Sequence, residues 1–285
     1  MTRRRFLRLS ALPALGGLAP AQTAKPKLKL SVRVEPLFKH MKLPEQMQKV
    51  AEAGYQGFEF GNWRAWDPAV ITPLAHKLGI ACACIVGNVG VNPKGMGLTN
   101  PAERAGFLTE IKASLEAAKR FETTQMVTLT ANAVPGMARE AQHQSIVAGL
   151  KAAHDIVAPH KVTLIVEPLN TLVDHKGYYL NHTAEAFEIM REVDSPFVKI
   201  LFDIYHVQIM DGNLIDTIRK NIGYIAHFHV GDVPGRHEPG TGEINYRNVF
   251  RAIHDLGFSG FVAMEYNPSK DPMETLAEVK EMAWS

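Results

Sequence analysis

Four residues that could bind a metal ion or move a proton each follow a short apolar run of the sequence. These residues are Glu167, Asp203, His229 and Glu265. Their runs are rich in Val, Ile, Leu and Phe, which is typical of parallel strands buried on both faces. Three carboxylates and one imidazole suit Mn²⁺ or Mg²⁺ and leave positions open for a substrate. We therefore expect the four side chains to bind one divalent metal ion, provided that their strands end at a common rim.

Each of these residues also has an ordinary structural explanation when it is taken alone. A carboxylate at a strand end is often a helix cap, and a histidine in a strand is often satisfied by hydrogen bonds in the core. Four such groups unpaired at one rim would be costly to desolvate and would repel one another. Their combination therefore favours a metal site. His227 lies on the same face as His229 but one layer deeper, so we expect it to be structural.

Two further residues are candidates for binding a substrate. Arg236 lies in a loop rich in glycine and proline, residues 232–243, and can offer several donors to a carboxylate or a hydroxyl. An exposed loop with a solvated arginine is the alternative. His206 begins the helix after the sixth apolar run and is expected either to hydrogen-bond a substrate oxygen or to cap and pack that helix. Asp232 is expected to orient the histidine of the preceding strand or to cap the loop.

Expected strands and helices alternate eight times along the chain, and each candidate ligand falls at or near the end of an expected strand. The expected strands are residues 28–34, 57–60, 80–86, 125–130, 161–167, 198–203, 224–230 and 260–265. The expected helices are residues 44–54, 68–79, 101–120, 138–159, 183–193, 206–221, 246–256 and 272–284. Pro101 after Asn100 is a helix start signal, and Gly79 is placed where a helix commonly ends.

Eight such units without a break in composition predict one closed (β/α)8 TIM barrel of the α/β class, over residues 22–285. The competing architecture is a doubly wound open sheet. That fold would normally carry a glycine-rich phosphate loop after an early strand, and neither G-x-G-x-x-G nor a Walker sequence is present. In a TIM barrel the reacting groups stand at the carboxyl ends of the strands, which is where the four candidate ligands fall.

The charge of the chain is unevenly placed. The 285 residues include 31 Lys and Arg and 29 Asp and Glu, a formal net charge of +2. Four of the arginines lie in residues 1–21, which contain no acid, so residues 22–285 carry 27 basic and 29 acidic side chains. The resulting net charge of −2 argues against a nucleic-acid partner.

The N-terminal segment, residues 1–21, has the pattern of an export signal. The stretch TRRRFLR is similar to the twin-arginine motif S-R-R-x-F-L-K and precedes a short apolar run and an A-x-A cleavage site. The apolar run is too short to span a bilayer. We expect a cleaved signal and an exported, periplasmic protein without a stable membrane anchor. A disordered basic tail is the alternative.

Two cysteines, Cys82 and Cys84, provide no disulfide framework and no four-cysteine zinc site. Residues two apart in a strand point to the same face and are poorly placed to bridge each other. We expect both cysteines to pack in the core.

Several stretches resemble the hydroxypyruvate isomerase family. They are residues 167–170 (EPLN), 177–180 (GYYL), 202–210 (FDIYHVQIM) and 232–246 (DVPGRHEPGTGEINY). This family is part of the xylose isomerase-like TIM barrel superfamily, which includes ketose 3-epimerases and endonuclease IV. The resemblance covers nearly the whole chain after the signal and is most specific between residues 164 and 268, where residues 232–246 are a strong signal.

The resemblance implies a divalent metal ion, Mn²⁺ or Mg²⁺, bound by the four candidate ligands, and a homo-oligomer. Hydroxypyruvate isomerases often have glutamine at the position of His229, whereas the epimerases have histidine. The implied reaction is proton transfer next to a carbonyl through an enediolate, which converts hydroxypyruvate to tartronate semialdehyde. Glu167 and Glu265 would be the catalytic bases: one removes the proton and the other returns it.

Three other functions remain open from the sequence. An exported epimerase or isomerase of a sugar or 3-keto-sugar agrees with the histidine at position 229 and with the export signal. A DNA-repair nuclease would need more metal ligands and a basic surface, which the net charge of −2 disfavours. A non-catalytic sugar-binding barrel would not need both Glu167 and Glu265.

Overall fold

A computed structural model describes residues 27–88 and 94–285 and shows a closed barrel of eight parallel strands in sequence order. The strands are β1 (Lys29–Arg33), β2 (Gly57–Phe60), β3 (Ala81–Val86), β4 (Gln125–Thr128), β5 (Thr163–Val166), β6 (Val198–Asp203), β7 (Ile225–Val230) and β8 (Phe261–Met264). The prediction of one (β/α)8 barrel is therefore confirmed. The expected signal, residues 1–21, lies outside the described residues.

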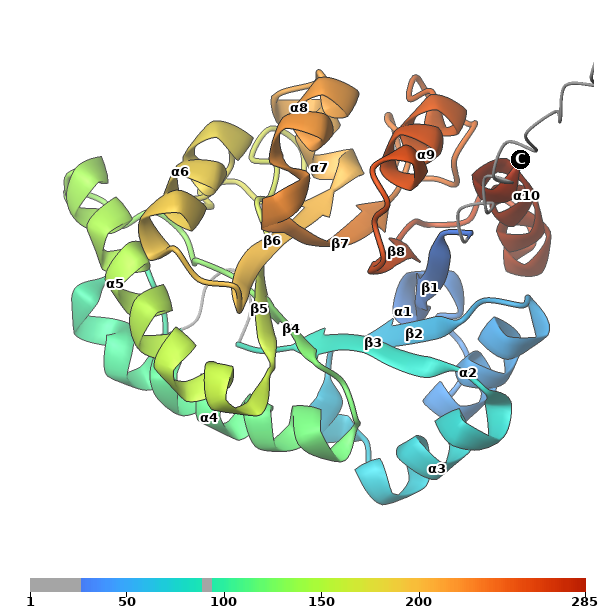
Figure 1. Ribbon diagram of the computed structural model, residues 1–285, viewed down its shortest axis with the longest axis horizontal. Coiled ribbons are helices and arrows are strands. Elements are labelled where there is room, and N and C mark those ends of the chain that lie inside the picture. The colour runs from blue at the N-terminus through green and yellow to red at the C-terminus, as the bar shows by residue number, and fades with distance from the viewer. Residues whose placement is uncertain (1–26, 89–93) are drawn as a thin grey trace, which may run out of the picture.

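The helices surround the strands (Figure 1). They are α1 (Val34–Leu37), α2 (Leu43–Glu52), α3 (Pro68–Leu78), α4 (Arg104–Arg120), α5 (Arg139–Val157), α6 (Thr183–Val193), α7 (Ile204–Met210), α8 (Leu214–Asn221), α9 (Tyr246–Asp255) and α10 (Pro272–Trp284). Short 3-10 helices occur at Trp63–Ala65, Pro101–Glu103, Ala158–His160 and Ile222–Tyr224. Within the described ranges, no helix is long and apolar enough to cross a membrane.

Local capping explains several of these boundaries. Asp67 accepts a hydrogen bond from the backbone N–H of Ala69 at the start of α3, and Gly79 ends that helix with a φ of 68°. Asn100 caps the turn before α4 in the same way, by accepting from Ala102. These are the positions where the sequence predicted a start and a stop.

The helix expected over residues 206–221 is divided into α7 and α8. Gly212 and Asn213 have φ values of 60° and 47°, which a right-handed helix does not accommodate. The turn at these two residues separates a short helix beside the rim from an outer helix. The helix prediction followed the apolar residues on both sides and passed over Asp211-Gly212-Asn213, which is a turn signal.

The strands have two different faces. Most outward side chains pack against the helices in the main hydrophobic core, whereas Cys84, Val127, Ile165 and Leu201 form a separate apolar cluster inside the barrel. Cys82 belongs to the outer core, so the expectation that both cysteines share one face is wrong. The register between β2 and β3 is irregular here, and this irregularity turns the two cysteines to different sides. Both thiols are buried, and neither forms a disulfide.

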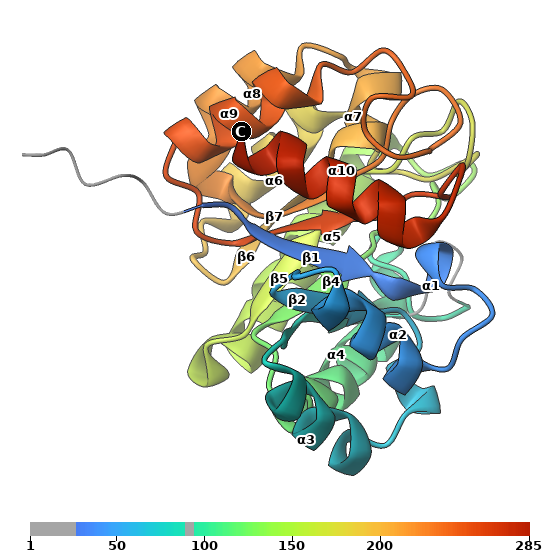
Figure 2. The same cartoon turned by 90° about the vertical axis from the view of Figure 1, so that its right-hand side faces the viewer.

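The barrel closes where its first and last strands pair. Val32 of β1 is opposite Met264 of β8 in a parallel register. Figure 2 shows β1, in blue, beside the red C-terminal helix α10. This closure places the ends of β1 and β8 at the same rim as the ends of β5, β6 and β7.

Candidate metal centre and active site

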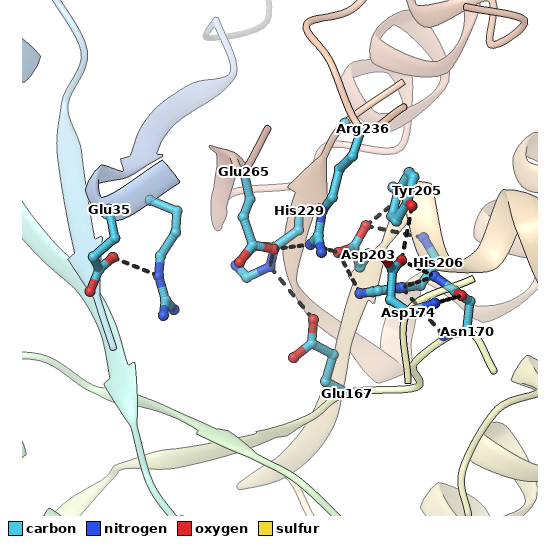
Figure 3. A network of polar contacts seen from close by, with 12 residues as sticks. Glu35, Glu167, Asn170, Asp174, Asp203, Tyr205, His206, His229, Arg236 and Glu265 are labelled. Atoms are coloured by element: carbon cyan, nitrogen blue, oxygen red, sulfur yellow. Dashed lines mark hydrogen bonds and ion pairs between the residues drawn. The ribbon is translucent and has the colours of Figure 1, made fainter. Parts of the chain in front are cut away.

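The structure brings the four predicted metal ligands to one end of the barrel. Asp203 is the last residue of β6, His229 lies near the end of β7, and Glu167 and Glu265 directly follow β5 and β8. One ligand atom from each residue lies within 4.8 Å of the others. Figure 3 shows Glu167, His229 and Glu265 grouped together, with Asp203 beside them. The grouping follows from the closed topology, because all eight strands run parallel.

His229 faces the cluster with its Nδ1 atom. This atom is 2.9 Å from Oε2 of Glu265 and 3.7 Å from Oε1 of Glu167. It is buried and makes no well-aligned hydrogen bond among the described residues. Burial alone would lower the pKa of His229, but the charges of Glu59 and Glu265 raise it well above its ordinary value. The surrounding carboxylates therefore favour positive charge on the His229 ring.

Glu59 of β2 lies beneath His229 and was not predicted from the sequence as a site residue. Its Oε1 is 2.7 Å from Nε2 of His229, and its Oε2 is 2.9 Å from Nε2 of His227. Burial opposes ionisation of Glu59, yet the two histidines lower its pKa far below the ordinary range. A carboxylate on the far nitrogen of a metal-binding histidine fixes the ring and leaves the near nitrogen for the metal. His227 is thus a buried structural residue, as expected.

Cys84 belongs to this deeper layer rather than to the rim. Its thiol donates to Oε2 of Glu59 at 3.1 Å. With Glu59 and His227 it forms a second group of buried side chains whose donor atoms are close enough for a metal ion. Burial and the charge of Glu59 raise the pKa of Cys84 well above its ordinary value, so the sulfur keeps its proton. A protonated thiol is a hydrogen-bond donor and a poor metal ligand.

The two carboxylate oxygens of Asp203 make different contacts, one with the start of α7 and the other with the cluster of candidate ligands. Its Oδ1 caps α7 by accepting from the backbone N–H of Tyr205 at 2.8 Å and of His206 at 3.3 Å. Its Oδ2 faces Nη2 of Arg236 at 3.0 Å. Burial and the nearby Glu265 raise the pKa of Asp203, despite the opposing charge of Arg236. The cap fixes the orientation in which Oδ2 points to the rim.

Arg236 enters the cluster from the loop after β7. Its Nη2 atom also donates to Oε2 of Glu265 at 2.5 Å, so one nitrogen contacts two of the predicted ligands. The guanidinium lies over the ring of Tyr205, 4.8 Å from its centroid. Burial opposes the charge of Glu265, but Arg236 and His229 lower its pKa well below the ordinary value. The structure therefore places Arg236 beside the cluster, where its charge offsets the carboxylates.

Asp232 holds the loop that carries Arg236. Its carboxylate accepts hydrogen bonds from the backbone N–H groups of Gly240, Gly242 and Ile244. A Cβ atom at Gly242 would lie 2.1 Å from the carbonyl oxygen of Val233, so only glycine fits there. Of the two roles expected for Asp232, the structure shows the loop cap.

His206 is held as a neutral donor by Asn170. The amide oxygen of Asn170 accepts from the backbone N–H groups of Val173 and Asp174, which fixes its NH₂ group toward Nδ1 of His206 at 2.7 Å. Nδ1 must therefore be the acceptor and Nε2 must carry the proton. Burial and the charge of Arg236 lower the pKa of His206 to about 3. Its Nε2 lies 3.5 Å from Asp203 at the edge of the cluster.

The donor set fits a divalent metal ion. Three carboxylates supply hard oxygen donors, and the buried Nδ1 of His229 supplies a nitrogen without a well-aligned partner. A divalent ion held by these four residues would keep positions open for a further ligand with oxygen donors.

Known proteins share both the sequence pattern and the fold. The pattern of the xylose isomerase-like TIM barrel family matches residues 47–283. Hydroxypyruvate isomerase of Escherichia coli (strain K12) is 28% identical over 247 residues, which are 85% of this chain and 94% of that protein.

Solved structures give the same architecture. A protein from Brucella melitensis described as an AP endonuclease of family 2 is 28% identical, with a TM-score of 0.80 over 90% of this chain and 98% of that one. The 3-keto-D-glucoside 4-epimerase of E. coli is 20% identical, with a TM-score of 0.77 over 90% of this chain and 100% of that one.

Proposed function

Because the chain belongs to the xylose isomerase-like TIM barrel family, we propose that it is a metal-dependent isomerase that moves a proton next to a carbonyl. The proposed reaction is the conversion of hydroxypyruvate to tartronate semialdehyde through an enediolate. The relative from E. coli named hydroxypyruvate isomerase supports this choice of substrate. One geometric observation supports a reaction with two bases: carboxylate oxygens of Glu167 and Glu265 both lie near Nδ1 of His229, at 3.7 and 2.9 Å.

The proposed metal ligands are Glu167, Asp203, His229 and Glu265, with Mn²⁺ or Mg²⁺ as the ion. A divalent ion bound there supplies Lewis-acid chemistry, because it polarises the carbonyl and stabilises negative charge on the substrate oxygens. A carboxylate that uses one oxygen as a ligand retains the other as a base. One of the two glutamates removes the proton from C3 of hydroxypyruvate, and a glutamate returns a proton to C2.

The hydrogen balance of the reaction needs a second transfer between oxygens. The C3 hydroxyl loses its proton as C3 becomes the aldehyde, and the C2 oxygen gains one as it becomes the hydroxyl. His206 is neutral and presents Nε2–H at the edge of the cluster, so it can donate a hydrogen bond to a substrate oxygen during this change. Arg236 supplies a fixed positive charge beside Asp203 and Glu265.

An exported epimerase or isomerase of a sugar or 3-keto-sugar is the second candidate. The histidine at position 229 favours it, and the same bases could return the proton to the opposite face of one carbon. A DNA-repair nuclease is less consistent with the chain, since residues 22–285 have a net charge of −2. Because the predicted bases both reach the cluster, a non-catalytic sugar-binding barrel is also disfavoured.

We further propose that residues 1–21 direct export to the periplasm. Cell fractionation of the wild type and of a variant with Arg3→Lys and Arg4→Lys tests this directly. Equal retention of both proteins in the cytoplasm would contradict it. A homo-oligomer is likewise proposed, from the family alone.

Metal removal tests the proposed function. We expect dialysis against EDTA to abolish the conversion of hydroxypyruvate, and added Mn²⁺ or Mg²⁺ to restore it. The product is measured by NMR after the reaction is stopped and the metal ion has been removed from the sample. A panel of ketoses and keto-sugars tested in parallel decides between the two candidates. Activity that survives complete metal removal would contradict the metal-dependent mechanism, and turnover of a sugar alone would favour the epimerase.

A further inference from the structure

A second arginine, Arg33, stands at the rim on the side opposite Asp203. It is the last residue of β1 and follows Ser31 on the inward face of that strand, whereas the intervening Val32 packs in the outer core. The pairing of Val32 with Met264 places Arg33 beside Glu265, one residue further along both strands. Arg33 therefore reaches the cluster from β1, an element that provides none of the proposed ligands.

The position of the guanidinium is fixed by Glu35. Nε of Arg33 donates to Oε2 of Glu35 at 2.8 Å, and Oε1 of Glu35 accepts from the backbone N–H of Gly61 at 2.5 Å. Both carboxylate oxygens are thus used, and Glu35 connects the ends of β1 and β2. Figure 3 shows Glu35 on one side of Glu265 and Asp203 on the other.

Gly61 allows this close approach. A Cβ atom at this position would lie 2.5 Å from Nη2 of Arg33. The guanidinium therefore lies directly against the backbone at the end of β2. Its side chain is only 18% exposed, so it is held within the rim and not in bulk solvent.

The two terminal nitrogens of Arg33 have no hydrogen-bond partner among the described residues. Its one ion pair is made by Nε, which leaves the Nη pair as a planar fork. Arg236 differs, because one of its Nη atoms already contacts both Asp203 and Glu265. Compared with Arg236, Arg33 thus has both of its Nη atoms without a partner in the described part of the chain, and such a fork matches a carboxylate.

We propose that Arg33 binds the carboxylate of the substrate and selects anionic 2-keto acids over neutral ketoses. The inference rests on the proposed function, since it assigns a substrate group to one side of the same site. Hydroxypyruvate would then have its carbonyl and hydroxyl between Glu167 and Glu265 and its carboxylate toward β1. Glu35 acts through Arg33 and is a positioning residue.

Kinetics with two ligands of similar size test the assignment. Hydroxypyruvate carries a carboxylate where dihydroxyacetone carries a CH₂OH group. In Arg33→Gln we expect KM for hydroxypyruvate to rise by about 10- to 100-fold, as for the loss of a charge-assisted hydrogen bond, with kcat within a few-fold of wild type. The inhibition constant of dihydroxyacetone should change by less than about threefold. Arg33→Lys should recover part of the loss, and Glu35→Gln should cause a smaller rise.

Arg64→Gln is the matched control, because Arg64 is an exposed arginine that pairs with Glu110 on the outside of the barrel. It should leave both constants unchanged. An unchanged KM for hydroxypyruvate in Arg33→Gln would overturn the inference, as would an equal loss for both ligands.

Failure of the role proposed for Arg33 can be distinguished from failure of the proposed reaction. If the wild type does not convert hydroxypyruvate, the proposed function fails, and calorimetry of hydroxypyruvate binding to wild type and Arg33→Gln still decides the role of Arg33. Weaker binding of the anion by the variant would support it, and equal binding would overturn it.

Discussion

At the scale of single residues, the candidate ligands could be predicted because strand ends are places where chemistry concentrates in a barrel. Glu167, Asp203 and Glu265 each stand at such an end, and the structure brings them together. Glu59 was not predicted because it lies inside a four-residue strand, where its contact with His229 depends on the barrel closing. An acidic residue in a fully buried strand was the available signal.

Glu59 should determine how tightly the cluster binds a metal ion. In Glu59→Gln the fixed charge behind Nε2 of His229 is lost, and we expect the affinity for Mn²⁺ to fall by about 10- to 100-fold. Calorimetry with Mn²⁺ measures this without reference to activity. The Glu122→Gln variant, which changes an exposed carboxylate paired with His76, is the control. Unchanged Mn²⁺ affinity in Glu59→Gln would show that the buried carboxylate does not support the ligand.

Asn170 should determine which nitrogen of His206 carries the proton. Asn170→Asp keeps the oxygen that accepts from the backbone but replaces the donor facing Nδ1 by an acceptor, which draws the proton to Nδ1. We expect kcat/KM to fall by at least about tenfold, because the donor at the substrate is lost or misdirected. The ¹⁵N chemical shifts of the ring report the tautomer independently. An unchanged tautomer with unchanged kinetics would remove this role.

At the scale of elements, strand and helix positions follow from periodicity, but the turns within them do not. The division between α7 and α8 arises from two residues with positive φ, Gly212 and Asn213. The loop after β7 was expected from its glycines and prolines, whereas its anchoring by Asp232 depends on contacts across the loop. Local patterns thus predict where a loop lies and not how it is held.

Helices α5 and α6 are joined by a pH-sensitive contact. His143 of α5 is 2.8 Å from Glu192 and 3.3 Å from Glu185 of α6, and Arg139 also pairs with Glu185. Burial would lower the pKa of His143, but the hydrogen bonds to the two glutamates raise it. A raised pKa in the folded protein stabilises it most below the ordinary value near 6.5 and less as pH rises through the folded value.

His143→Gln should therefore lower Tm more at pH 6 than at pH 9. The expected loss at pH 6 is about 1 kcal/mol of unfolding free energy, the typical net contribution of a hydrogen bond, and less at pH 9. Thermal unfolding at both pH values measures it. His76→Gln, which changes an exposed histidine, serves as the reference. An equal fall in Tm at the two pH values would mean that His143 contributes packing and not charge.

For the molecule as a whole, the alternation of eight strands with helices was enough to predict the closed barrel. Closure itself, which pairs β1 with β8, brings Arg33 beside Glu265 and Glu59 beneath His229. These contacts join residues that are far apart in sequence and carry no local pattern. The clustering of the candidate ligands at strand ends was therefore predictable, while the contacts across the barrel to Glu59 and Arg33 were not.

We propose that the protein moves a proton through an enediolate and does not shift a hydride. Conversion of hydroxypyruvate in D₂O by the Mg²⁺-loaded protein, followed by NMR, distinguishes the two routes, with enzyme-free and Glu265→Gln samples as controls. We expect solvent deuterium at C2 of the tartronate semialdehyde from the first turnovers, and no turnover in Glu265→Gln with the barrel still folded. Product that carries no deuterium at C2 would contradict proton transfer through an enediolate.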